Sequence, residues 1–386
     1  MSWLEIRVRD PIIARDGRPF SATQRRMRSL DWPYPSVLAG SLRTLVAKMA
    51  NLSFTAGVAE RLRQIEIAGP LPMVEGELYF PKPADCVVSA EDGVRKCYVS
   101  RPCEMGGGGC NLPGSARVRG PKLLPAMLAA GIEDFKPAKT PAFWSQKQMT
   151  AWLVEEKYAT PPDPDDAAAG GGFLNAPEQD QRTHVMIEAE TGAARDRYLF
   201  QTSGLDLAES VKLAARSESA DAELAGTLAQ LDAMHPLGGE RRVAHWTHSD
   251  GAAWEAPGRV VEALAKTKLV RMVLATPAVF SDGWRPGWVG EDLRCEQAGV
   301  VMRLKAVAIE RWRPISGWNL ERSANSKLGP KAIKRAVPAG GVYFFEVEGE
   351  GGAAELARRL WLRPVSDGEQ DCRDGFGLAL WGAWHT

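Results

Sequence analysis

The hydrophobic pattern of the first fifty residues predicts a strand followed by a helix. Residues 3–8 alternate apolar and polar side chains and contain Ile6 and Val8, which is the period of a half-buried strand. Residues 35–49 have the helical period instead. The apolar side of this expected helix is formed by Leu38, Leu42, Leu45 and Met49.

Two more strands are expected at residues 63–68 and 77–80. They are separated by the turn signals Gly69-Pro70 and Pro72. The resulting order of strand, helix, strand and strand is the beginning of a ferredoxin-like or RRM-like unit.

The middle of the chain predicts an insertion and a linker. From residue 81 to about 150 the sequence is rich in Gly, Pro and scattered Cys and has no sustained period. Residues 161–166 combine Pro with Asp, and residues 167–172 consist of Ala and Gly, which is typical of a linker. The predicted division is an N-terminal domain at 1–160 with an insertion at about 84–150, a linker or disordered loop at 161–180, and a C-terminal domain at 181–386 with a Gly-rich loop.

The second half repeats the mixture of strands and helices. Apolar and β-branched stretches predict strands at residues 185–188, 198–201, 268–275, 300–309 and 342–347. Helices are expected near residues 220–232 and 353–361. The fold class is therefore α+β in both halves, and we find no repeat between their sequences.

Composition changes this picture little. Hydrophobic residues make up 45% and charged residues 25% of the 386 residues, which excludes a wholly disordered or fibrous chain. The formal net charge is zero, so any nucleic-acid binding must come from local patches. The N-terminus has no secretory pattern and no apolar run reaches membrane-spanning length, so we expect a cytoplasmic protein whose six cysteines are reduced.

Two clusters of basic residues are candidates for contact with RNA. The first combines cations with tryptophans, a mixture that suits phosphate contacts and base stacking. Its residues are Trp312, Arg313, Trp318, Lys327, Lys331, Lys334 and Arg335. The second consists of Arg25, Arg26 and Arg28. A solvated charged loop explains each cluster equally well.

Glycines near the C-terminus and in the first helix are further candidates. Gly375-Phe376-Gly377 precedes the last expected strand, where glycines let a phosphate approach backbone amides, although a tight turn is their commonest use. Gly40 and Arg43 lie three positions apart on one helical face. This pair can host a phosphate, and an ordinary salt bridge explains the arginine as well.

Metal binding and catalysis receive little support. Cys86, Cys97, Cys103 and Cys110 lie in the insertion, but structural zinc sites use closer pairs of ligands, so free thiols are the better interpretation. No nucleophile elbow, phosphate-binding loop or acidic two-metal cluster is present in the sequence. We therefore predict no catalytic residue, no metal and no cofactor. Histidines that could serve as a general base are His184, His235 and His245.

A series of sequence blocks spread along the chain resembles one protein family. In the first half they are Asp16-Gly17-Arg18-Pro19-Phe20, Val37-Leu38-Ala39-Gly40-Ser41-Leu42-Arg43 and Leu78-Tyr79-Phe80-Pro81-Lys82-Pro83-Ala84-Asp85. In the second half they are Leu237-Gly238-Gly239-Glu240-Arg241-Arg242, Leu274-Ala275-Thr276-Pro277-Ala278-Val279-Phe280 with Gly283-Trp284, Ser316-Gly317-Trp318, Val337-Pro338-Ala339-Gly340-Gly341-Val342-Tyr343-Phe344-Phe345 and Gly375-Phe376-Gly377. The order and spread of these blocks resemble the third subunit of the type III-B (Cmr) CRISPR effector complex, a RAMP protein.

The resemblance implies a fold and a function. The fold would be two modified ferredoxin-like (RRM-like) domains with insertions. The function would be non-catalytic binding of the 5′ handle of the CRISPR RNA, with docking to the large polymerase-cyclase subunit and to the backbone RAMP subunits, and indirect coupling to target RNA. The alternatives are a metal-independent CRISPR RNA-processing endoribonuclease of the RAMP class and an adaptor that binds only protein.

Overall fold

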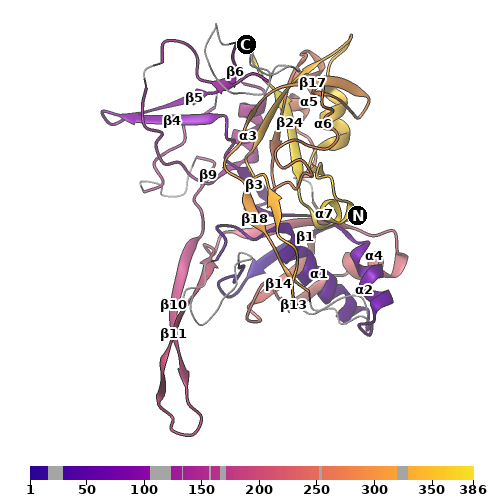
Figure 1. The fold of residues 1–386 in the computed structure, drawn as a ribbon. Coiled ribbons are helices and arrows are strands. Elements are labelled where there is room, and N and C mark those ends of the chain that lie inside the picture. The colour runs from indigo at the N-terminus through magenta and orange to yellow at the C-terminus, as the bar shows by residue number, and fades with distance from the viewer. Residues whose placement is uncertain are drawn as a thin grey trace. The chain divides into compact units, whose positions relative to one another are not determined.

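The chain folds into two compact units, each assembled from three separate segments (Figure 1). The computed structural model describes residues 1–15, 29–104, 123–132, 134–155, 158–165, 171–251, 254–319 and 329–386. Unit 1 comprises Met1–Pro70, Ala176–Gly251 and Pro314–Arg335, and unit 2 comprises Leu71–Asn175, Ala252–Arg313 and Ala336–Thr386. Both units take segments from either side of residues 161–180, so they differ from the continuous halves expected from the sequence.

Unit 1 is built on an antiparallel sheet with its N-terminal strand in the middle. The strand order is β13 (Asp232–Pro236), β14 (Val243–Ser249), β1 (Ser2–Val8), β12 (Lys212–Glu218) and β2 (Glu66–Val74). The expected opening strand is confirmed as β1. It pairs antiparallel with β12 on one side, from Ser2 opposite Ser217, and with β14 on the other, from Trp3 opposite Ser249.

Three helices supply the apolar side chains that cover one face of this sheet. The predicted first helix is confirmed as α1 (Pro35–Met49), where Leu38, Leu42 and Leu45 are buried in one cluster with Leu4 and Ile6 of β1. Proline at the first helical position fits α1 because its missing N–H would have no helical partner there. The other two helices are α2 (Ala56–Arg63) and α4 (Ala222–Ala229).

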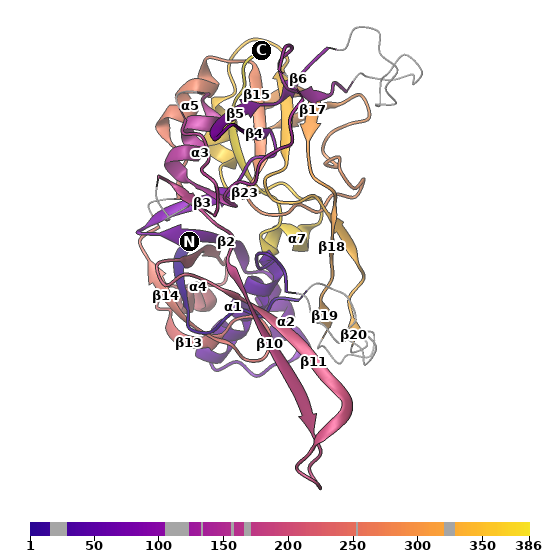
Figure 2. The ribbon, with the colours of Figure 1, turned by 90° about the vertical axis from the view of Figure 1, so that its left-hand side faces the viewer.

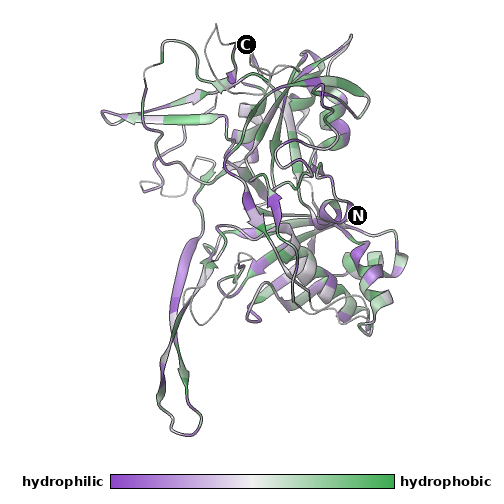
Figure 3. Cartoon of the chain, viewed as in Figure 1, coloured by the Kyte–Doolittle hydropathy of each residue, from purple (hydrophilic) through white to green (hydrophobic). Residues whose placement is uncertain are grey.

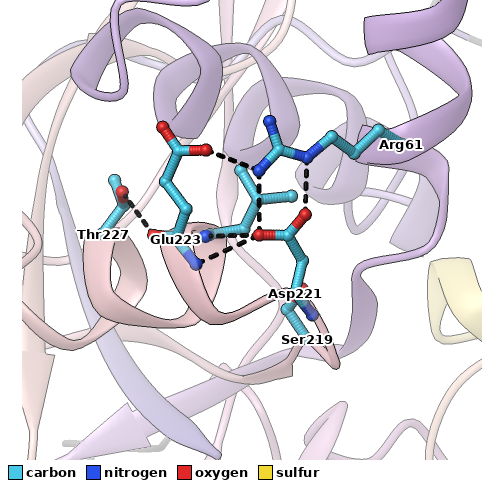
Figure 4. A network of polar contacts seen from close by, with 6 residues as sticks. Arg61, Ser219, Asp221, Glu223 and Thr227 are labelled. Carbon is cyan, nitrogen blue, oxygen red and sulfur yellow. Dashed lines mark hydrogen bonds and ion pairs between the residues drawn. The ribbon is translucent and has the colours of Figure 1, made fainter.

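An ionic and capping network joins α2 to α4 (Figure 4). Asp221 caps α4 by accepting hydrogen bonds from the backbone N–H groups of Glu223 and Leu224. The same carboxylate accepts from the Arg61 guanidinium of α2 at 2.5 and 2.9 Å, and Glu223 accepts from Arg61 at 2.6 Å. Because of the Arg61 hydrogen bonds and the backbone bonds, the pKa of Asp221 is lowered to about 2.

The turn expected at Gly69-Pro70 and Pro72 is wrong, because β2 continues through both prolines to Val74. Alternate residues of a strand direct their N–H groups to the same edge, so Pro70 and Pro72 remove donors from one edge only. The pairing of β2 with β3 (Glu77–Pro81) begins after them, with Met73 opposite Leu78. Helix α2, which lies just before β2, was not predicted.

A long two-stranded hairpin, β10 (Glu178–Ile187) and β11 (Ala194–Asp206), belongs to unit 1. Figures 1 and 2 show the two strands running side by side well beyond the sheet of their own unit. Backbone hydrogen bonds in both directions between Ile12 and Leu205 hold the base of the hairpin. The sequence predicted only its distal apolar stretches.

A second antiparallel part of unit 1 lies within residues 314–335. We call its described residues, 314–319 and 329–335, the basic arm. The chain enters it through β18 (Arg313–Ile315) and returns through β21 (Lys334–Ala336), which pairs with β18. Farther along, β19 (Trp318–Asn319) pairs with β20 (Gly329–Pro330). The Lys331 backbone N–H donates to the Gly317 carbonyl at 2.8 Å, which ties the two sides together.

Unit 2 contains a six-stranded antiparallel sheet. Its order is β16 (Arg294–Gln297), β17 (Val300–Ala308), β22 (Val342–Val347), β15 (Leu269–Leu274), β24 (Leu378–Ala383) and β23 (Arg363–Pro364). The predicted strands near 268–275, 300–309 and 342–347 are confirmed. Helices α5 (Gly258–Ala265) and α6 (Ala354–Leu360) pack on each other and on β24.

The stretch predicted as an insertion without a sustained period contains regular structure. It forms the hairpin β4 (Cys86–Glu91) and β5 (Val94–Val99), the short pair β6 (Arg101–Pro102) and β7 (Ala126–Met127), and then β8 (Phe143–Ser145) and α3 (Gln146–Leu153). Strand β8 lies between β3 and β9 (Phe173–Leu174). The buried rings of Trp144 and Trp152 pack edge to face with their centroids 5.3 Å apart, so this stretch contributes to the core.

A buried ionic network lies within unit 2. The side chains of Arg271 on β15 and Asp85 before β4 are both 0% exposed, and Arg271 Nη1 donates to Asp85 Oδ2 at 2.7 Å. Trp152 Nε1 donates to the other Asp85 oxygen at 3.0 Å, and Arg271 also donates to the Trp152 carbonyl. Burial raises the pKa of Asp85, while Arg271 and Trp152 oppose that shift.

No helix among the described residues has the length and apolar content that a membrane span requires.

Candidate functional site

The basic arm brings several of the predicted RNA-binding residues together. Lys331, Lys334 and Arg335 are all exposed within a few residues of chain, and β21 begins at Lys334. Trp312 and Arg313 precede the arm and belong to unit 2, and Trp312 is 45% exposed. Trp318 lies on β19. Lys327 lies outside the described residues, as do Arg25, Arg26 and Arg28.

The neighbours of the arginine-rich segment are nevertheless described. Arg15 and Ser29, the residues on either side of 16–28, pair as an antiparallel bridge, and the Leu30 N–H donates to the Ala14 carbonyl at 2.7 Å. The chain therefore enters and leaves this segment at one place in unit 1.

A glycine loop between β13 and β14 lies against this same place. The Gly239 N–H donates to the Ile13 carbonyl at 2.7 Å, and a Cβ at Gly238, whose φ is +83°, would lie 2.5 Å from that oxygen. Only glycine lets the two backbones approach so closely. Arg241 is exposed and Arg242 is half-buried next to these glycines, and neither was among the predicted site residues. The signal in the sequence is the pair of glycines followed by the pair of arginines.

Gly40 and Arg43 of α1 have different surroundings. Gly40 is exposed, and outside the backbone of α1 itself no described atom lies within 4 Å of the position that a Cβ would take, so no backbone approach among the described residues requires glycine there. Arg43 donates to the carbonyls of Arg63 at 3.3 Å and Ile65 at 2.8 Å. These bonds join α1 to the end of α2 and the start of β2, which is a structural role.

Gly375-Phe376-Gly377 forms a buried turn in unit 2. The N–H groups of Gly375, Phe376 and Gly377 donate to the carbonyls of Cys372, Asp371 and Pro277, at 3.0, 2.9 and 2.8 Å. Both glycines have positive φ, and Phe376 is 2% exposed. Since all three amides already have acceptors inside the protein, the geometry favours a tight turn over a phosphate cradle.

The three candidate histidines occupy separate positions in unit 1. His184 stacks on Phe200 at 5.2 Å on the long hairpin and is hydrogen-bonded to Thr202 Oγ1 at 2.9 Å. His235 is buried on β13, and desolvation lowers its pKa. His245 Nε2 donates to Asp232 Oδ1 at 2.6 Å on the neighbouring strand. His245 is thus the histidine of the three that a carboxylate orients.

The cysteines of unit 2 do not gather a metal-binding set among the residues that the structure describes. Cys86 and Cys97 of the β4–β5 hairpin approach to 3.4 Å between their sulfur atoms, while Cys103 is exposed. Cys110 lies outside the described part of the chain.

Comparison with known proteins identifies the family. A family model described as "CRISPR-associated protein (Cas_Cmr3)" matches residues 4–384. No curated protein matches the sequence. Among solved structures, a chain of the type III-B Cmr-beta complex bound to cognate target RNA and AMPPnP, studied by cryo-electron microscopy, is 15% identical. The match covers 89% of this chain and 86% of that one, with a TM-score of 0.49.

A chain of the crystal structure of the Csm3–Csm4 subcomplex of the type III-A interference complex is 10% identical, with full coverage of both chains and a TM-score of 0.42. The resemblance first given by the sequence blocks is confirmed by the family match, which leaves out only a few residues at each end. The chain therefore belongs to the CRISPR-associated protein family Cas_Cmr3 and is a type III CRISPR effector subunit.

Proposed function

We propose that this chain is a non-catalytic RNA-binding subunit of a type III-B effector complex, which binds the 5′ handle of the CRISPR RNA. It would dock to the large polymerase-cyclase subunit and to the backbone RAMP subunits, and it would meet target RNA only indirectly. Family membership supports the assembly. The observation that carries the RNA-binding role is the exposure of Lys331, Lys334 and Arg335 on the basic arm of unit 1.

The chemistry of the arm suits a single RNA strand. The strand carries one negative phosphate per nucleotide, and the returning side of the arm presents the exposed cations Lys331, Lys334 and Arg335 within five residues of chain. Exposed lysine and arginine contact phosphates without reading the sequence, so this contact would hold the handle by its backbone. A chain with no net charge binds RNA through such a local patch.

The loop at Gly238–Arg242 is a second proposed contact in unit 1. Its close approach to Ile13 places Arg241 and Arg242 near the bridge between Arg15 and Ser29, the described residues on either side of the arginine-rich segment 16–28. Arg242 Nη2 lies 3.6 Å from Glu240 Oε2, so the carboxylate partly compensates the charge of Arg242. The neighbouring Arg241 is exposed. We assign the first contact to the basic arm because it concentrates more exposed cations.

We further propose that both units are modified ferredoxin-like domains. In unit 1, the strands β1, β2, β12 and β14 lie in the order β14-β1-β12-β2, with helices after β1 and after β12. In unit 2, the strands β15, β17, β22 and β24 lie in the corresponding order β24-β15-β22-β17, with α6 after β22 and, in the described residues 275–299, no helix after β15. The strand orders support this assignment. Read across either sheet, the four strands are the fourth, first, third and second in chain order, which is the order of a split βαβ arrangement.

Charge reversal on the arm tests the RNA-binding role. The double variant Lys331→Glu with Lys334→Glu should weaken binding of a labelled RNA carrying the handle at least tenfold, measured by fluorescence anisotropy at several salt concentrations. It should also reduce the slope of log affinity against log salt, by about 0.7 for each phosphate of the single strand that the variant no longer neutralises. The matched control is Lys266→Glu with Lys268→Glu, two exposed lysines near α5.

If both double variants weakened RNA binding equally, the weakening would come from the change in overall charge and not from the position of the lysines. Unchanged binding in the arm variant would contradict the assignment of the arm as the contact. An RNA of the same length without the handle should bind more weakly to the unmodified chain.

One observation favours the processing endoribonuclease as a second candidate. A carboxylate that orients a histidine, as Asp232 orients His245, is a common arrangement for a general base. A labelled repeat RNA incubated with the protein in EDTA tests this function. Cleavage at one site that is lost in His245→Ala and retained in His248→Ala would replace the non-catalytic assignment.

A further inference from the structure

The β4–β5 hairpin of unit 2 holds two cysteines on one of its faces. Cys86 begins β4 opposite Val99, and Cys97 of β5 lies opposite Val88. Residues two positions apart in a strand share a face, so Cys86 and Cys97 are diagonal neighbours across the two strands. Figure 3 shows hydrophobic colouring toward the start of β4. The two sulfur atoms lie 3.4 Å apart, and both cysteines are in the thiol form. The hairpin therefore presents a dithiol, which the proposed binding of the handle does not use.

Little movement is needed to join the two sulfurs. A disulfide has its sulfur atoms about 2.0 Å apart. The ladder from Cys86 opposite Val99 to Glu91 opposite Val94 already fixes the register of the strands, so the approach requires rotation of side chains and not a shift of strands. Among the residues that the structure describes, no group of three or more metal-binding side chains includes the pair. A structural zinc ion takes four ligands, so the pair suits a bond between its own sulfurs better than a metal.

The two thiols differ in access and in acidity. Cys86 is 1% exposed, whereas Cys97 is half-buried and can meet a small molecule from solvent. The hydrogen bond between the two sulfurs lowers the pKa of Cys97 and raises the pKa of Cys86, whose burial raises it further. The positive charge of Lys82 favours the thiolate form of both cysteines. Because the thiolate is the nucleophile, Cys97 is the group that attacks, and Cys86 is the neighbour that can replace the attached group.

We propose that Cys97 and Cys86 form a thiol-modification site that reacts with small disulfides such as oxidised glutathione. The Cys97 thiolate attacks one sulfur of the small disulfide, which forms a mixed disulfide and releases one small thiolate. Cys86 passes its proton to the released thiolate and attacks the Cys97 sulfur. The Cys86–Cys97 bond forms, and the second small thiolate leaves to solvent. One small disulfide is thereby reduced to two thiol groups, and the protein dithiol is oxidised.

The closed bond would fix the position of Asp85. This residue directly precedes Cys86, and its carboxylate accepts from the buried Arg271 at 2.7 Å. On the returning strand, the Ser100 N–H donates to the Asp85 carbonyl at 2.8 Å. A disulfide restricts the opened chain more than the native one, so the bond would favour the closed hairpin around Asp85. Reducing surroundings keep the pair as a dithiol, and oxidising surroundings would tighten unit 2. The inference is independent of the proposed binding of RNA.

The test measures formation of the disulfide in the folded full chain. Purified protein is incubated with oxidised glutathione, the remaining thiols are blocked with N-ethylmaleimide, and the protein is digested without reduction for mass spectrometry. The peptides of Cys86 and Cys97 should be linked to each other in most molecules, and dithiothreitol should separate them. Cys103, which is exposed in the same unit, is the internal control and should not be linked to either of them.

Single substitutions separate the two steps. Cys86→Ser should stop the reaction after the first step, so that Cys97 retains one glutathione. Cys97→Ser should leave the buried Cys86 without glutathione. Measured against Cys86→Ser alone, Cys86→Ser with Lys82→Gln should need a higher pH to reach half of the maximal rate of the first step, while the maximal rate at high pH is kept. If Lys82 had only a structural role, its loss would lower the rate at every pH.

Hydrogen exchange measures the effect on unit 2. Amides of residues 86–99 should exchange at least tenfold more slowly in the oxidised protein than in the dithiol form. The double variant Cys86→Ser with Cys97→Ser should exchange equally with and without oxidised glutathione. Absence of the linked peptides, or their appearance only after unfolding in urea, would overturn the proposed site. Linked peptides whose amides exchange as fast as in the dithiol form would overturn the proposed effect on the hairpin.

Discussion

Arg271 is a charged side chain in a strand whose other residues are apolar. Its guanidinium is fully buried and is held by Asp85, by the Trp152 carbonyl and by Glu155, whose Oε1 lies 3.2 Å away. Arg101 binds the other oxygen of Glu155 at 2.6 Å. Taking such charges out of water is costly, and it is tolerated only because each charge finds a partner. Residues far apart in the sequence are thereby fixed in one arrangement.

Removal of this one side chain should strongly destabilise unit 2. Arg271→Met leaves Asp85 buried without its cation, so we expect a loss of about 3–5 kcal/mol in the free energy of unfolding, measured with urea. The control is Arg303→Met. The side chains of Arg303 and of its partner Glu348 are 36% and 29% exposed, so the loss should stay below about 1 kcal/mol. Adding Asp85→Leu to Arg271→Met should recover part of the stability. An equal loss in Arg271→Met and the Arg303→Met control would show that the buried network contributes no more to the free energy of unfolding than a partly exposed ion pair.

At the scale of secondary structure, the junction of α2 and α4 depends on one carboxylate. Asp221 satisfies the first amides of α4 and binds Arg61 of α2 at the same time. A helix cap and an interhelical ion pair are therefore combined in one side chain, and the two effects can be separated by substitution (Figure 4).

Asp221→Asn should keep the cap and lose the ion pair, while Asp221→Ala should lose both. The missing cap should cost Asp221→Ala about 1 kcal/mol more than Asp221→Asn at pH 7, measured by chemical unfolding. Because the folded pKa of Asp221 is about 2, below the ordinary 3.8, the ion pair contributes fully above pH 3.8 and is lost as the pH falls toward 2. The wild-type protein and Asp221→Asn should therefore converge in that window. A constant difference down to pH 2 would contradict the assignment.

At the scale of the whole molecule, the chain passes between the two units five times, so neither unit is a continuous piece. Strand β1 separates β12 from β14 in unit 1, and Asp85 neutralises Arg271 across a separation of 186 residues in unit 2. A cut between residues 160 and 181 therefore removes essential parts from both units at once.

We expect the fragments 1–160 and 181–386 to be unable to fold separately and to fold together when co-expressed. Circular dichroism in the near ultraviolet and the cooperativity of urea unfolding would measure this. A cooperative transition in fragment 181–386 alone would show that its strands can close without β1.

Much of the local structure could be predicted from the sequence, because it depends on neighbouring residues. The alternation in β1 and the leucine spacing of α1 report the burial of one face, and both elements appear where they were expected. The long hairpin was predicted only at its apolar end, since Glu178–Arg182 carry no apolar period. At Pro70 and Pro72, pairing along the other edge of β2 prevailed over the local turn preference.

The arrangement of the candidate site depends on long-range contacts and could be predicted only in part. The positive charge of Lys331, Lys334 and Arg335 is evident in the sequence, and the structure adds that all three are exposed. The sequence cannot show that Arg43 uses its guanidinium to hold two carbonyls, or that the amides of Gly375-Phe376-Gly377 are already occupied. Both facts come from contacts with residues outside the motif.

The central position of β1 also determines when unit 1 can form during synthesis. Both partners of this first strand lie more than 200 residues later, with Ser217 opposite Ser2 and Ser249 opposite Trp3. At roughly 5–20 residues per second, the ribosome needs on the order of 10–50 s to add the stretch between β1 and β14. Both edges of this half-buried strand remain open until β12 has been made, and the edge that pairs with β14 remains open to the end of that interval. We therefore expect unit 1 to complete its sheet only after β14 has been made, late in synthesis.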